Sequence, residues 1–516
     1  MSNKYLAGID VGTTGAKTGI FDLKGNLMSS GYIEYSCSYP KPNWVEQDAS
    51  VLLESAMDSA KEAISKSKIN PEDIASVAVS SQRTCSIFID KQGYLLRPMI
   101  SWQDNRTTDE LEEINLKISP SEFYKITGLP SNTTWVLSKI LWVRKKEPKI
   151  WERVSKVIQL QDYILKSLGA EDYFVDISDA GLYGLWETDN LQWSEKMLKL
   201  FEIDKAILPI PKSSGSKVGV ISKLASEKIG FKKGTPICVG AGDQNSAVIG
   251  AGIVKDGFLS VSLGTGGIAI SYLDKKFRDP NEKGCITNHA IKGKWQLEGY
   301  QAGAASVFKW FKDEIAVLEK VFAEKTGNDI YVILDKMIKK TPIGAKGLVF
   351  LPYLASATSP RWNSYARGTL VGLTFAHNKW CIARAFVEGI ILEMKDIINS
   401  MLESGIEINN IHLMGGPTKS DLWNQIQADM YNREVKTLKI TDAAVLGAAI
   451  LAGVGVGIFN DIREGISKMV KIDRQYKPIK ENVQLYDELY EIYCKVYEGL
   501  ESMEVFKILS KFQKRY

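Results

Sequence analysis

Residues 5–22 of the chain read YLAGIDVGTTGAKTGIFD. The pattern predicts a short strand from Tyr5 to Ile9, a turn from Asp10 to Gly15, and a second strand from Thr18 to Asp22. The core of the turn, Gly12-Thr13-Thr14-Gly15, offers successive backbone N–H groups and small hydroxyl side chains, which together can hold a phosphate. A hairpin turn that only reverses the chain is the alternative, because glycine and threonine are common in turns and strands.

The same pattern returns in the second half of the chain. A predicted strand at Phe258 to Leu263 is followed by a Gly-Thr-Gly-Gly turn at residues 264–267 and by another strand at Ile268 to Tyr272. A third glycine turn, at Gly415 and Gly416, precedes a predicted helix that Ser420 or Thr418 can cap. Three such loops, drawn from both halves, would enclose one nucleotide.

Two aspartates stand beside these loops. Asp10 directly precedes the first loop, where it would repel a phosphate unless Mg²⁺ lay between them. Asp243 follows the predicted strand at Thr235 to Gly240, and there it could take the proton from a hydroxyl group that attacks a γ-phosphate. The alternative for Asp243 is an N-cap of the helix expected at residues 246–252.

Length and composition set the class of protein. The 516 residues are 45% hydrophobic and 24% charged with a net charge of +4, so we expect a globular protein of two to four units that binds no nucleic acid. The six cysteines contain no CxxC pair and the three histidines stand apart, which argues against disulfides and a zinc site. The first residues lack a signal-peptide pattern, and residues 443–459 are interpreted as a buried helix rather than a membrane span. A cytoplasmic location without membrane contact is therefore expected.

The recurrence of the glycine loops divides the chain. It reduces the expected units to two, residues 1–246 and 247–516, each of mixed α and β structure. The sequence predicts its main helices at residues 49–67, 107–117, 139–146, 304–325 and 380–403, and from 481 onward.

The motifs of the chain, in their order, resemble those of the FGGY family of carbohydrate kinases, which belongs to the actin, hexokinase and heat-shock ATPase superfamily. The resemblance is carried by GIDVGTTGAKTGIFD at residues 8–22, NWVEQD at 43–48, SSQR at 80–83, WQDNRT at 102–107, GAGDQNSAVIGAG at 240–252, SLGTGG at 262–267, PRWN at 360–363 and GGPTKSDLWNQIQADM at 415–430. It implies an α/β fold with two ribonuclease H-like (actin-like ATPase) domains and a nucleotide cleft between them. Residues 1–246 would hold the sugar, the first phosphate loop and the catalytic aspartate, and residues 247–516 would bind ATP and end in helices.

The resemblance also implies roles for single residues, with ATP and Mg²⁺ as cofactors. Asp243 would be the catalytic base, and Asp10 would hold Mg²⁺ through water. The nucleotide would be bound by Gly12, Thr13, Thr14, Gly264, Thr265, Gly266, Gly415, Gly416 and Ser420. The acceptor would be bound by Gln82, Arg83, Thr84, Trp102, Asp104, Asp243 and Gln244. One nucleotide contact of the family departs from its pattern here, because the glycine of Gly303-Ala304-Ala305-Ser306 is shifted.

Four positions bear on the identity of the acceptor. Arg83 and Trp102 match glycerol kinases, but Thr84 and Thr134 stand where those enzymes have an acidic residue and a tyrosine, and this disfavours glycerol. Xylulokinases would have Met-His in place of Arg83-Thr84. A ketopentose such as xylulose is the first expectation, and another ketose or a polyol of the glycerol or erythritol type is the second. Trp102 as a core aromatic residue and Arg83 as a surface ion-pair partner are the structural alternatives.

Other classes of protein remain to be weighed. A non-catalytic ATP-binding regulator of the same superfamily would keep the phosphate loops but could lose the base. A chaperone ATPase would need a peptide-binding domain after the nucleotide lobes, and a dehydrogenase would need a GxGxxG turn between its first strand and helix. The sequence favours neither class, because it shows neither feature. The expected partner is a small sugar or polyol, and a homodimer is compatible with the resemblance.

Overall fold

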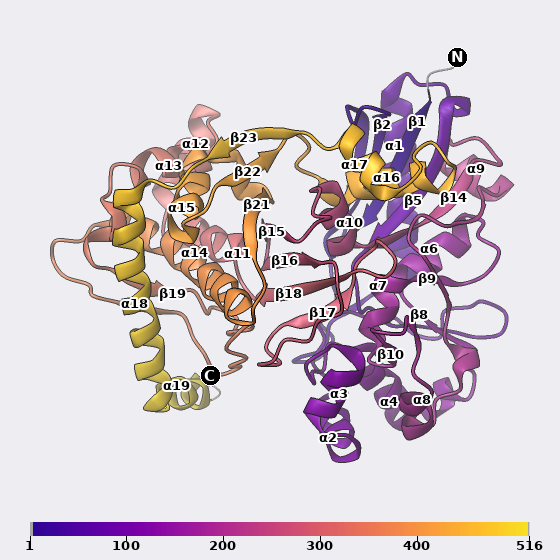
Figure 1. Ribbon diagram of the computed structural model, residues 1–516, viewed down its shortest axis with the longest axis horizontal. Coiled ribbons are helices and arrows are strands. Elements are labelled where there is room, and N and C mark those ends of the chain that lie inside the picture. The colour runs from indigo at the N-terminus through magenta and orange to yellow at the C-terminus, as the bar shows by residue number, and fades with distance from the viewer. Residues whose placement is uncertain (1–3, 514, 516) are drawn as a thin grey trace.

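The computed structural model describes residues 4–513 and 515. Each half of the chain builds one large mixed sheet, with strand order β13-β14-β5-β1-β2-β3 in the first and β17-β18-β16-β15-β21-β22-β23 in the second (Figure 1). The first sheet contains β1 Tyr5–Val11, β2 Gly15–Asp22, β3 Leu27–Glu34, β5 Ile74–Ser81, β13 Lys217–Val220 and β14 Pro236–Gly242. The second contains β15 Gly257–Leu263, β16 Gly267–Leu273, β17 Cys285–Asn288, β18 Trp295–Gln301, β21 Ile408–Met414, β22 Val435–Leu438 and β23 Ile472–Tyr476.

Both sheets contain the same five-strand unit. In the first, β1 and β2 are antiparallel, β2 and β3 are antiparallel, and β1, β5 and β14 run parallel. In the second, β15, β16, β18, β21 and β22 repeat these relations in the same order. The recurrence that the two glycine loops predicted is therefore confirmed as a repeated fold.

The first glycine turn is shorter than predicted. Asp10 and Val11 belong to β1, and Gly15 already begins β2. The reason is pairing on both sides, because Asp10 lies opposite Lys17 of β2 and Ser80 of β5. Only Gly12 to Thr14 remain outside the strands, so Asp10 is held rigidly at the end of a strand.

Helices surround both sheets. In the first half they are α1 Ala49–Ser67, α2 Thr108–Lys117, α3 Pro120–Thr127, α4 Val136–Lys146, α5 Pro148–Trp151, α6 Leu160–Leu168, α7 Ile177–Ala180, α8 Glu195–Phe201, α9 Lys223–Ile229 and α10 Asp243–Gly250. In the second half they are α11 Ala305–Glu314, α12 Val317–Thr326, α13 Ile330–Ile338, α14 Lys379–Glu403, α15 Asp421–Tyr431, α16 Ala443–Gly455, α17 Ile462–Met469, α18 Lys480–Ser502 and α19 Val505–Gln513. Short strand pairs complete the first half (β4 Glu46–Gln47 with β7 Met99–Ile100, β6 Ile87–Ile89 with β8 Lys156–Ile158, β9 Phe174–Asp176 with β12 Ile210–Lys212, β10 Trp186–Glu187 with β11 Gln192–Trp193) and the second (β19 Val349–Leu351 with β20 Thr369–Val371).

Two helices join the halves by packing on each other's sheets. α10 comes from the first half, and its Val248 packs with Ile268 and Ile270 of the second sheet. α16 comes from the second half, and its Leu446 and Ile450 pack with residues of the first sheet, where Figure 1 shows it in yellow among the purple strands. α10 and α16 also contact each other. The boundary expected between residues 246 and 247 falls inside α10.

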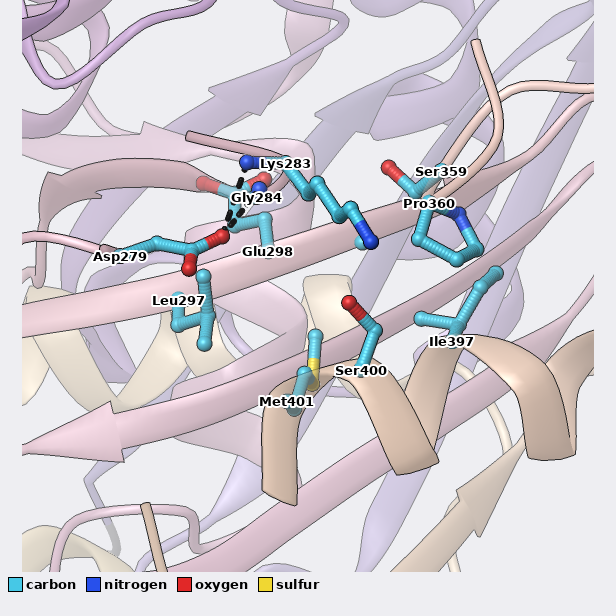
Figure 2. Close-up of a pocket in the computed structure, with 11 residues that line it drawn as sticks. Asp279, Lys283, Gly284, Leu297, Glu298, Ser359, Pro360, Ile397, Ser400 and Met401 are labelled. Carbon is cyan, nitrogen blue, oxygen red and sulfur yellow. Dashed lines mark hydrogen bonds between the residues drawn. The ribbon is translucent and has the colours of Figure 1, made fainter. Parts of the chain in front are cut away.

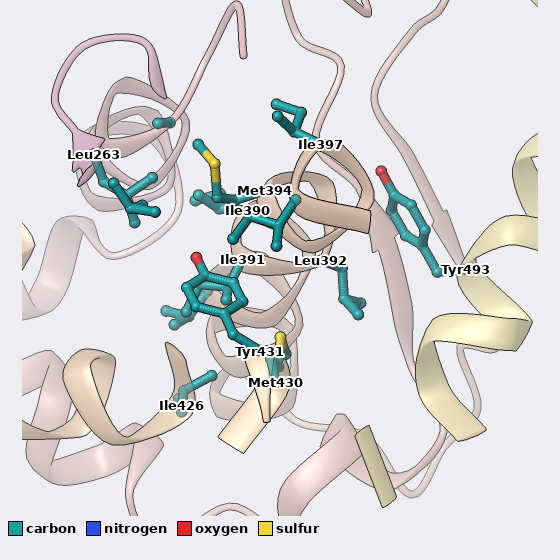
Figure 3. Packing of buried hydrophobic residues seen from close by; sticks show 14 of the residues in the cluster. Leu263, Ile390, Ile391, Leu392, Met394, Ile397, Ile426, Met430, Tyr431 and Tyr493 are labelled. Atoms are coloured by element: carbon teal, nitrogen blue, oxygen red, sulfur yellow. The ribbon is translucent and has the colours of Figure 1, made fainter. Parts of the chain in front are cut away.

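The core of the second half forms around α14. Its residues from Ala383 to Ile398 are all buried. Figure 3 shows five of them, Ile390, Ile391, Leu392, Met394 and Ile397, between Leu263 of β15, Ile426 of α15 and Tyr493 of α18. Burial on every side favours a long helix that is apolar over most of its surface. Over residues 4–513 and 515, no helix is long and apolar enough to cross a membrane, and residues 443–455 form the buried helix α16.

Candidate active site

Asp10 and Asp243 lie at the carboxyl ends of β1 and β14, two parallel strands on either side of β5. Asp10 is the next-to-last residue of β1, and its Oδ1 accepts a hydrogen bond from Ser80 Oγ of β5 at 2.9 Å. Asp243 directly follows β14, the strand on the other side of β5. Burial and the charge of Asp243 raise the pKa of Asp10 to about 7. Two carboxylates that repel each other this way form a donor set suited to a hard divalent cation.

Asp243 is the first residue of α10, one position after the N-cap residue Gly242. Its Oδ1 accepts the backbone N–H of Gln244 at 2.7 Å, so it contributes to the helix terminus while its side chain stays 26% exposed. Burial raises the pKa of Asp243, and the nearby guanidinium of Arg83 opposes that shift. Gly242 is required here, because a Cβ would lie 2.5 Å from both Arg83 Cδ and Asp179 Oδ1. The absence of a side chain at Gly242 therefore lets Arg83 approach Asp243.

The first glycine loop is tied down through its carbonyl groups. The carbonyl of Gly12 accepts from Tyr35 Oη at 2.6 Å, that of Thr13 from Gln47 Nε2 at 2.9 Å, and that of Thr14 from the Tyr35 N–H at 3.0 Å. Phosphate oxygens need donors and would be repelled by carbonyl oxygens. Three carbonyls bound to the protein therefore suit this loop to an anion.

The second loop is built in the same way. The carbonyl of Gly264 accepts from Ala305 N–H at 2.8 Å, that of Thr265 from Ala304 N–H at 2.9 Å, and that of Gly266 from Gly264 N–H at 2.9 Å. The loop thereby contacts the start of α11. The departure at Gly303 noted in the sequence lies next to this contact.

The third turn lies next to the second loop, because β15 and β21 are parallel and Ser262 pairs with Met414. Gly415 has φ +90°, and a Cβ there would lie 2.5 Å from the Leu263 carbonyl oxygen, so only glycine fits. Ser420 caps α15, accepting the Trp423 N–H at 3.2 Å, whereas the Thr418 hydroxyl donates to the Gly415 carbonyl. Of the two caps considered, Ser420 is confirmed.

Trp102 connects the predicted acceptor residues to the first loop. Its Nε1 donates to Thr13 Oγ1 at 3.0 Å, and its side chain is 41% exposed. The alternative of a core aromatic residue is therefore wrong. Gln82 belongs to the same group, since its Nε2 donates to Gln47 Oε1 at 2.8 Å and Gln47 in turn holds the Thr13 carbonyl.

Arg83 is buried and bound to the second domain. Its Nη1 and Nη2 donate to Glu298 Oε1 and Oε2 of β18 at 3.1 and 2.8 Å. Its Nη1 also reaches Asn245 Oδ1 at 3.0 Å, its Nη2 reaches Tyr300 Oη at 3.3 Å, and its Nε lies 3.5 Å from Asp243 Oδ1. Arg83 is an ion-pair partner, but in the interior rather than on the surface.

Thr84 and Asp104 are occupied by internal hydrogen bonds. Thr84 adopts φ +59°, its N–H donates to Gln159 Oε1 at 2.6 Å, and its carbonyl accepts from the buried Lys139 Nζ at 2.6 Å. Asp104 is 0% exposed, accepts the Val45 N–H at 2.6 Å and forms two bonds with the Arg106 guanidinium at 2.9 and 2.7 Å. Their contact with an acceptor stays a prediction, and their bonds in this structure shape the loops around Trp102.

Four residues at the site were missed from sequence. Glu298 and Tyr300 lie two residues apart on β18 and so point to the same face, and Asn245 lies in the first turn of α10. Asp442 precedes α16, and its Oδ2 binds Lys17 Nζ at 2.5 Å, one strand away from Asp10. Nothing local marks them; the only signal is an acidic residue inside an otherwise apolar strand for Glu298 and one before a helix for Asp442.

Two cavities lie against α14, and the first of them is also lined by Glu298. One of about 10 Å³ lies between β18, α14 and two loops, where Asp279 accepts the N–H groups of Lys283 and Gly284 (Figure 2). A second of about 480 Å³ lies between α14, α18 and Arg361. Neither is lined by a residue predicted from sequence for catalysis or binding. Within the part of the chain that the structure describes, no three His, Cys, Asp or Glu side chains form a metal-binding group.

The chain matches known proteins over nearly its whole length. Residues 5–250 match the N-terminal domain and residues 259–456 the C-terminal domain of the FGGY family of carbohydrate kinases. The chain is 29% identical to a xylulose kinase of Staphylococcus epidermidis over 505 residues, 98% of each chain, and 30% identical to a gluconokinase of Bacillus subtilis over 505 residues, 96% of each. The ligand-bound crystal structure of xylulose kinase from Lactobacillus acidophilus has a TM-score of 0.87 at 26% identity and covers 96% of this chain and 98% of that one.

Proposed function

The chain belongs to the FGGY family of carbohydrate kinases, and from this premise we propose that it transfers the γ-phosphate of ATP to a hydroxyl group of a ketopentose such as xylulose. The family makes it an enzyme, a phosphotransferase with an alcohol group as acceptor, and gives it two actin-like ATPase domains. The acceptor and the roles of single residues are the proposal.

The observation that carries the mechanism is the carboxylate of Asp243 at the end of β14, partly exposed and next to Arg83. A hydroxyl group that attacks a phosphoryl group must lose its proton, and a carboxylate within reach can accept it. Burial raises the pKa of Asp243, which makes the carboxylate a better proton acceptor than an exposed aspartate. Gln82, Trp102 and Gln244 would orient the acceptor beside it.

The nucleotide would be held from both halves of the chain. Gly12, Thr13 and Thr14 would bind phosphate on one side and Gly264, Thr265 and Gly266 on the other, which is supported by the tied carbonyls of both loops. Gly415, Gly416 and Ser420 would lie against the adenosine. Phosphoryl transfer depends on such positioning and charge neutralisation more than on covalent chemistry.

Asp10 is the residue that would hold Mg²⁺, through water. Its buried carboxyl group, with a pKa raised to about 7 next to Asp243, gains from a divalent cation, so the residues present fit the ion. When bound, Mg²⁺ would neutralise charge on the phosphates. Ser80 fixes the Asp10 side chain by its hydrogen bond, and Lys17, on the neighbouring strand β2, binds Asp442 at the start of α16.

A neutral acceptor fits the site better than an aldonate does. Gluconate is the second candidate, because of the similarity to a gluconokinase. An anionic acceptor needs an uncompensated cation, whereas the charge of Arg83 is balanced by Glu298. The other proposed acceptor residues are either uncharged (Gln82, Thr84, Trp102 and Gln244) or acidic (Asp104 and Asp243). The neutral ketopentose is therefore preferred.

Two experiments test the proposal. An ATP-consumption screen with D-xylulose, D-ribulose, gluconate, glycerol and erythritol is expected to give the highest kcat/KM with a ketopentose, and a preference for gluconate would overturn the acceptor assignment. Asp243→Asn is expected to lower turnover by about 10²–10⁴-fold with ATP binding retained. Near-normal turnover by this variant would refute the role of Asp243 as the base.

A further inference from the structure

We propose that Glu298 is a positioning residue for the base Asp243 and that it acts across the domain boundary by holding Arg83. The inference rests on the proposed function, because it takes Asp243 as the base. Glu298 lies on β18 of the second sheet, whereas Arg83 follows β5 and Asp243 follows β14 of the first.

The guanidinium group of Arg83 contacts two carboxylates, Glu298 through its Nη atoms and Asp243 through its Nε atom. Its Nη1 and Nη2 meet the two oxygens of Glu298 at 3.1 and 2.8 Å, and its Nε lies 3.5 Å from Asp243 Oδ1. A guanidinium group is planar and rigid, so a carboxylate that fixes one edge also fixes the direction of the other. Glu298 therefore determines where Arg83 meets Asp243.

Glu298 is built to remain charged and fixed. Its side chain is fully buried, and it accepts further hydrogen bonds from Thr287 Oγ1 at 2.5 Å, Gln296 Nε2 at 2.8 Å and Tyr300 Oη at 2.7 Å. Burial raises the pKa of Glu298, but Arg83 and the hydrogen bonds from Thr287 and Gln296 outweigh it and lower the pKa to about 2. A buried pair with this many hydrogen bonds holds its geometry, and removing one partner leaves the other charge uncompensated.

The competing role for Arg83 is direct contact with the acceptor. All five of its donors already face protein oxygens, because Asn245 Oδ1 and Tyr300 Oη take the Nη hydrogens that Glu298 leaves. An acceptor hydroxyl could reach the guanidinium only by displacing one of these partners. The two roles differ in kinetics: a lost positioning residue lowers kcat, whereas a lost ligand raises the KM for the acceptor.

The test compares Glu298→Gln and Glu298→Asp in the full-length protein, with saturating ATP and with D-xylulose or whichever sugar of the panel is phosphorylated fastest. Glu298→Gln keeps the size of the side chain and removes its charge. We expect it to lower kcat by about 10²-fold, the loss typical of a displaced catalytic group, with the acceptor KM changed less than about 3-fold. Glu298→Asp keeps the charge and should recover a large part of kcat.

Glu388→Gln is the matched control. Glu388 is also a buried partner of an arginine, since its Oε1 accepts from Arg384 Nε at 2.7 Å, but both residues lie on α14. Its loss should lower the unfolding temperature as Glu298→Gln does and leave kcat unchanged. If Glu298→Gln does not fold, Tyr300→Phe removes only a hydroxyl that binds both Glu298 and Arg83, and it should lower kcat in the same direction.

Three outcomes would overturn the inference: an unchanged kcat in Glu298→Gln and Tyr300→Phe, a rise in acceptor KM at unchanged kcat, or an equal loss of kcat in Glu388→Gln. Asp243→Asn separates this inference from the proposed function. Full turnover by Asp243→Asn would refute the assignment of Asp243 as the base, and the proposed mechanism would fail with it. If Asp243→Asn is inactive while Glu298→Gln is normal, only the positioning role fails.

Discussion

At the scale of single residues, His289 is a buried basic group whose two ring nitrogens both have a backbone partner. Its Nδ1 accepts the Ile291 N–H at 3.0 Å, which leaves Nε2 to donate to the Ile253 carbonyl at 3.1 Å. The ring is fully buried, and burial lowers its pKa to about 3. It therefore stays neutral in the folded protein at any pH above about 3.

We expect His289 to make the protein less stable as the pH falls from 6.5 towards 3. Below pH 6.5 the His289 side chain binds a proton in the unfolded chain but not in the folded one. Its contribution to the free energy of unfolding is therefore complete above pH 6.5 and decreases, as the pH falls, by up to about 1.4 kcal/mol per pH unit. His289→Gln should flatten this dependence of the unfolding temperature, although it lowers stability at neutral pH. His377→Gln, on a loop, serves as the control, and an unchanged slope in His289→Gln would contradict the assignment.

Residues of the site differ in how far the sequence could predict them. Asp243 and Gly415 are marked by local patterns, a strand followed by a glycine turn, and the structure places both at strand ends. The partner of Arg83 is Glu298, which is 215 residues away, and no local pattern connects two such positions. The ion pair that occupies Asp104 is local, because its partner Arg106 is two residues away, but no pattern in the sequence shows that both side chains are buried.

At the scale of elements, the crossing of α10 and α16 depends on glycine. A Cβ on Gly447 would lie 1.8 Å from the Ser246 carbonyl oxygen, and one on Gly250 would lie 1.9 Å from that of Ala443. The two helix backbones therefore touch, and α10 begins with Asp243. Packing between these helices sets the position of Asp243.

Gly447→Ala is expected to destabilise the protein by about 1–3 kcal/mol, because two helices must separate to admit a methyl group. It should also lower kcat, since α10 would shift with Asp243. The measurements are the denaturation midpoint and steady-state kinetics. Gly499→Ala, in the last turn of α18 with open space around it, should instead stabilise by about 0.5–1 kcal/mol. Equal effects of the two substitutions would argue against close helix packing.

Helices with strong periodicity were predicted closely. The helix expected at residues 49–67 matches α1, which Asp48 caps, and the helix expected at 380–403 matches α14 within one residue. The expected helix at 304–325 is instead two helices, α11 and α12, separated at Ile315 and Ala316. No glycine or proline marks that break; Ala316 is buried in the core, and tertiary packing rather than local propensity ends the helix there.

At the scale of the whole molecule, the first sheet is completed by the second half of the chain. Val445, Leu446, Ile450 and Leu451 of α16 are buried in the cluster that includes Leu6, Ala78 and Cys238 of the first sheet. Each such side chain contributes about 1.5–3 kcal/mol when buried, and their sum is comparable to the whole stability of a typical domain. The sequence could show that two units recur, but not that each lends a helix to the other.

A fragment of residues 1–256 is therefore expected to aggregate, because it lacks α16 and α17. The same fragment joined through a flexible linker to residues 440–471 should be soluble and unfold cooperatively. Joining it instead to residues 480–511, an equally long segment around α18, should not rescue it. Circular dichroism and size-exclusion chromatography distinguish these results, and a well-folded fragment of residues 1–256 alone would show that α16 is dispensable.

Closure of the two halves is the last expectation, and it follows from placing phosphate loops on both. A nucleotide bound between the Gly12 loop and the Gly264 loop would draw the halves together and exclude water that could hydrolyse ATP. Asp243→Asn allows both substrates to be bound without turnover. Without ligands, the radius of gyration of this variant, measured by small-angle scattering, should be about 24 Å, the value for a compact chain of this length. It should fall measurably when ATP, Mg²⁺ and the sugar are added together, and less with ATP alone. Since Arg83 and Glu298 already join the halves at the base of the site, the motion should be a rotation about that contact, and a radius unaffected by both ligands would show that the halves are fixed.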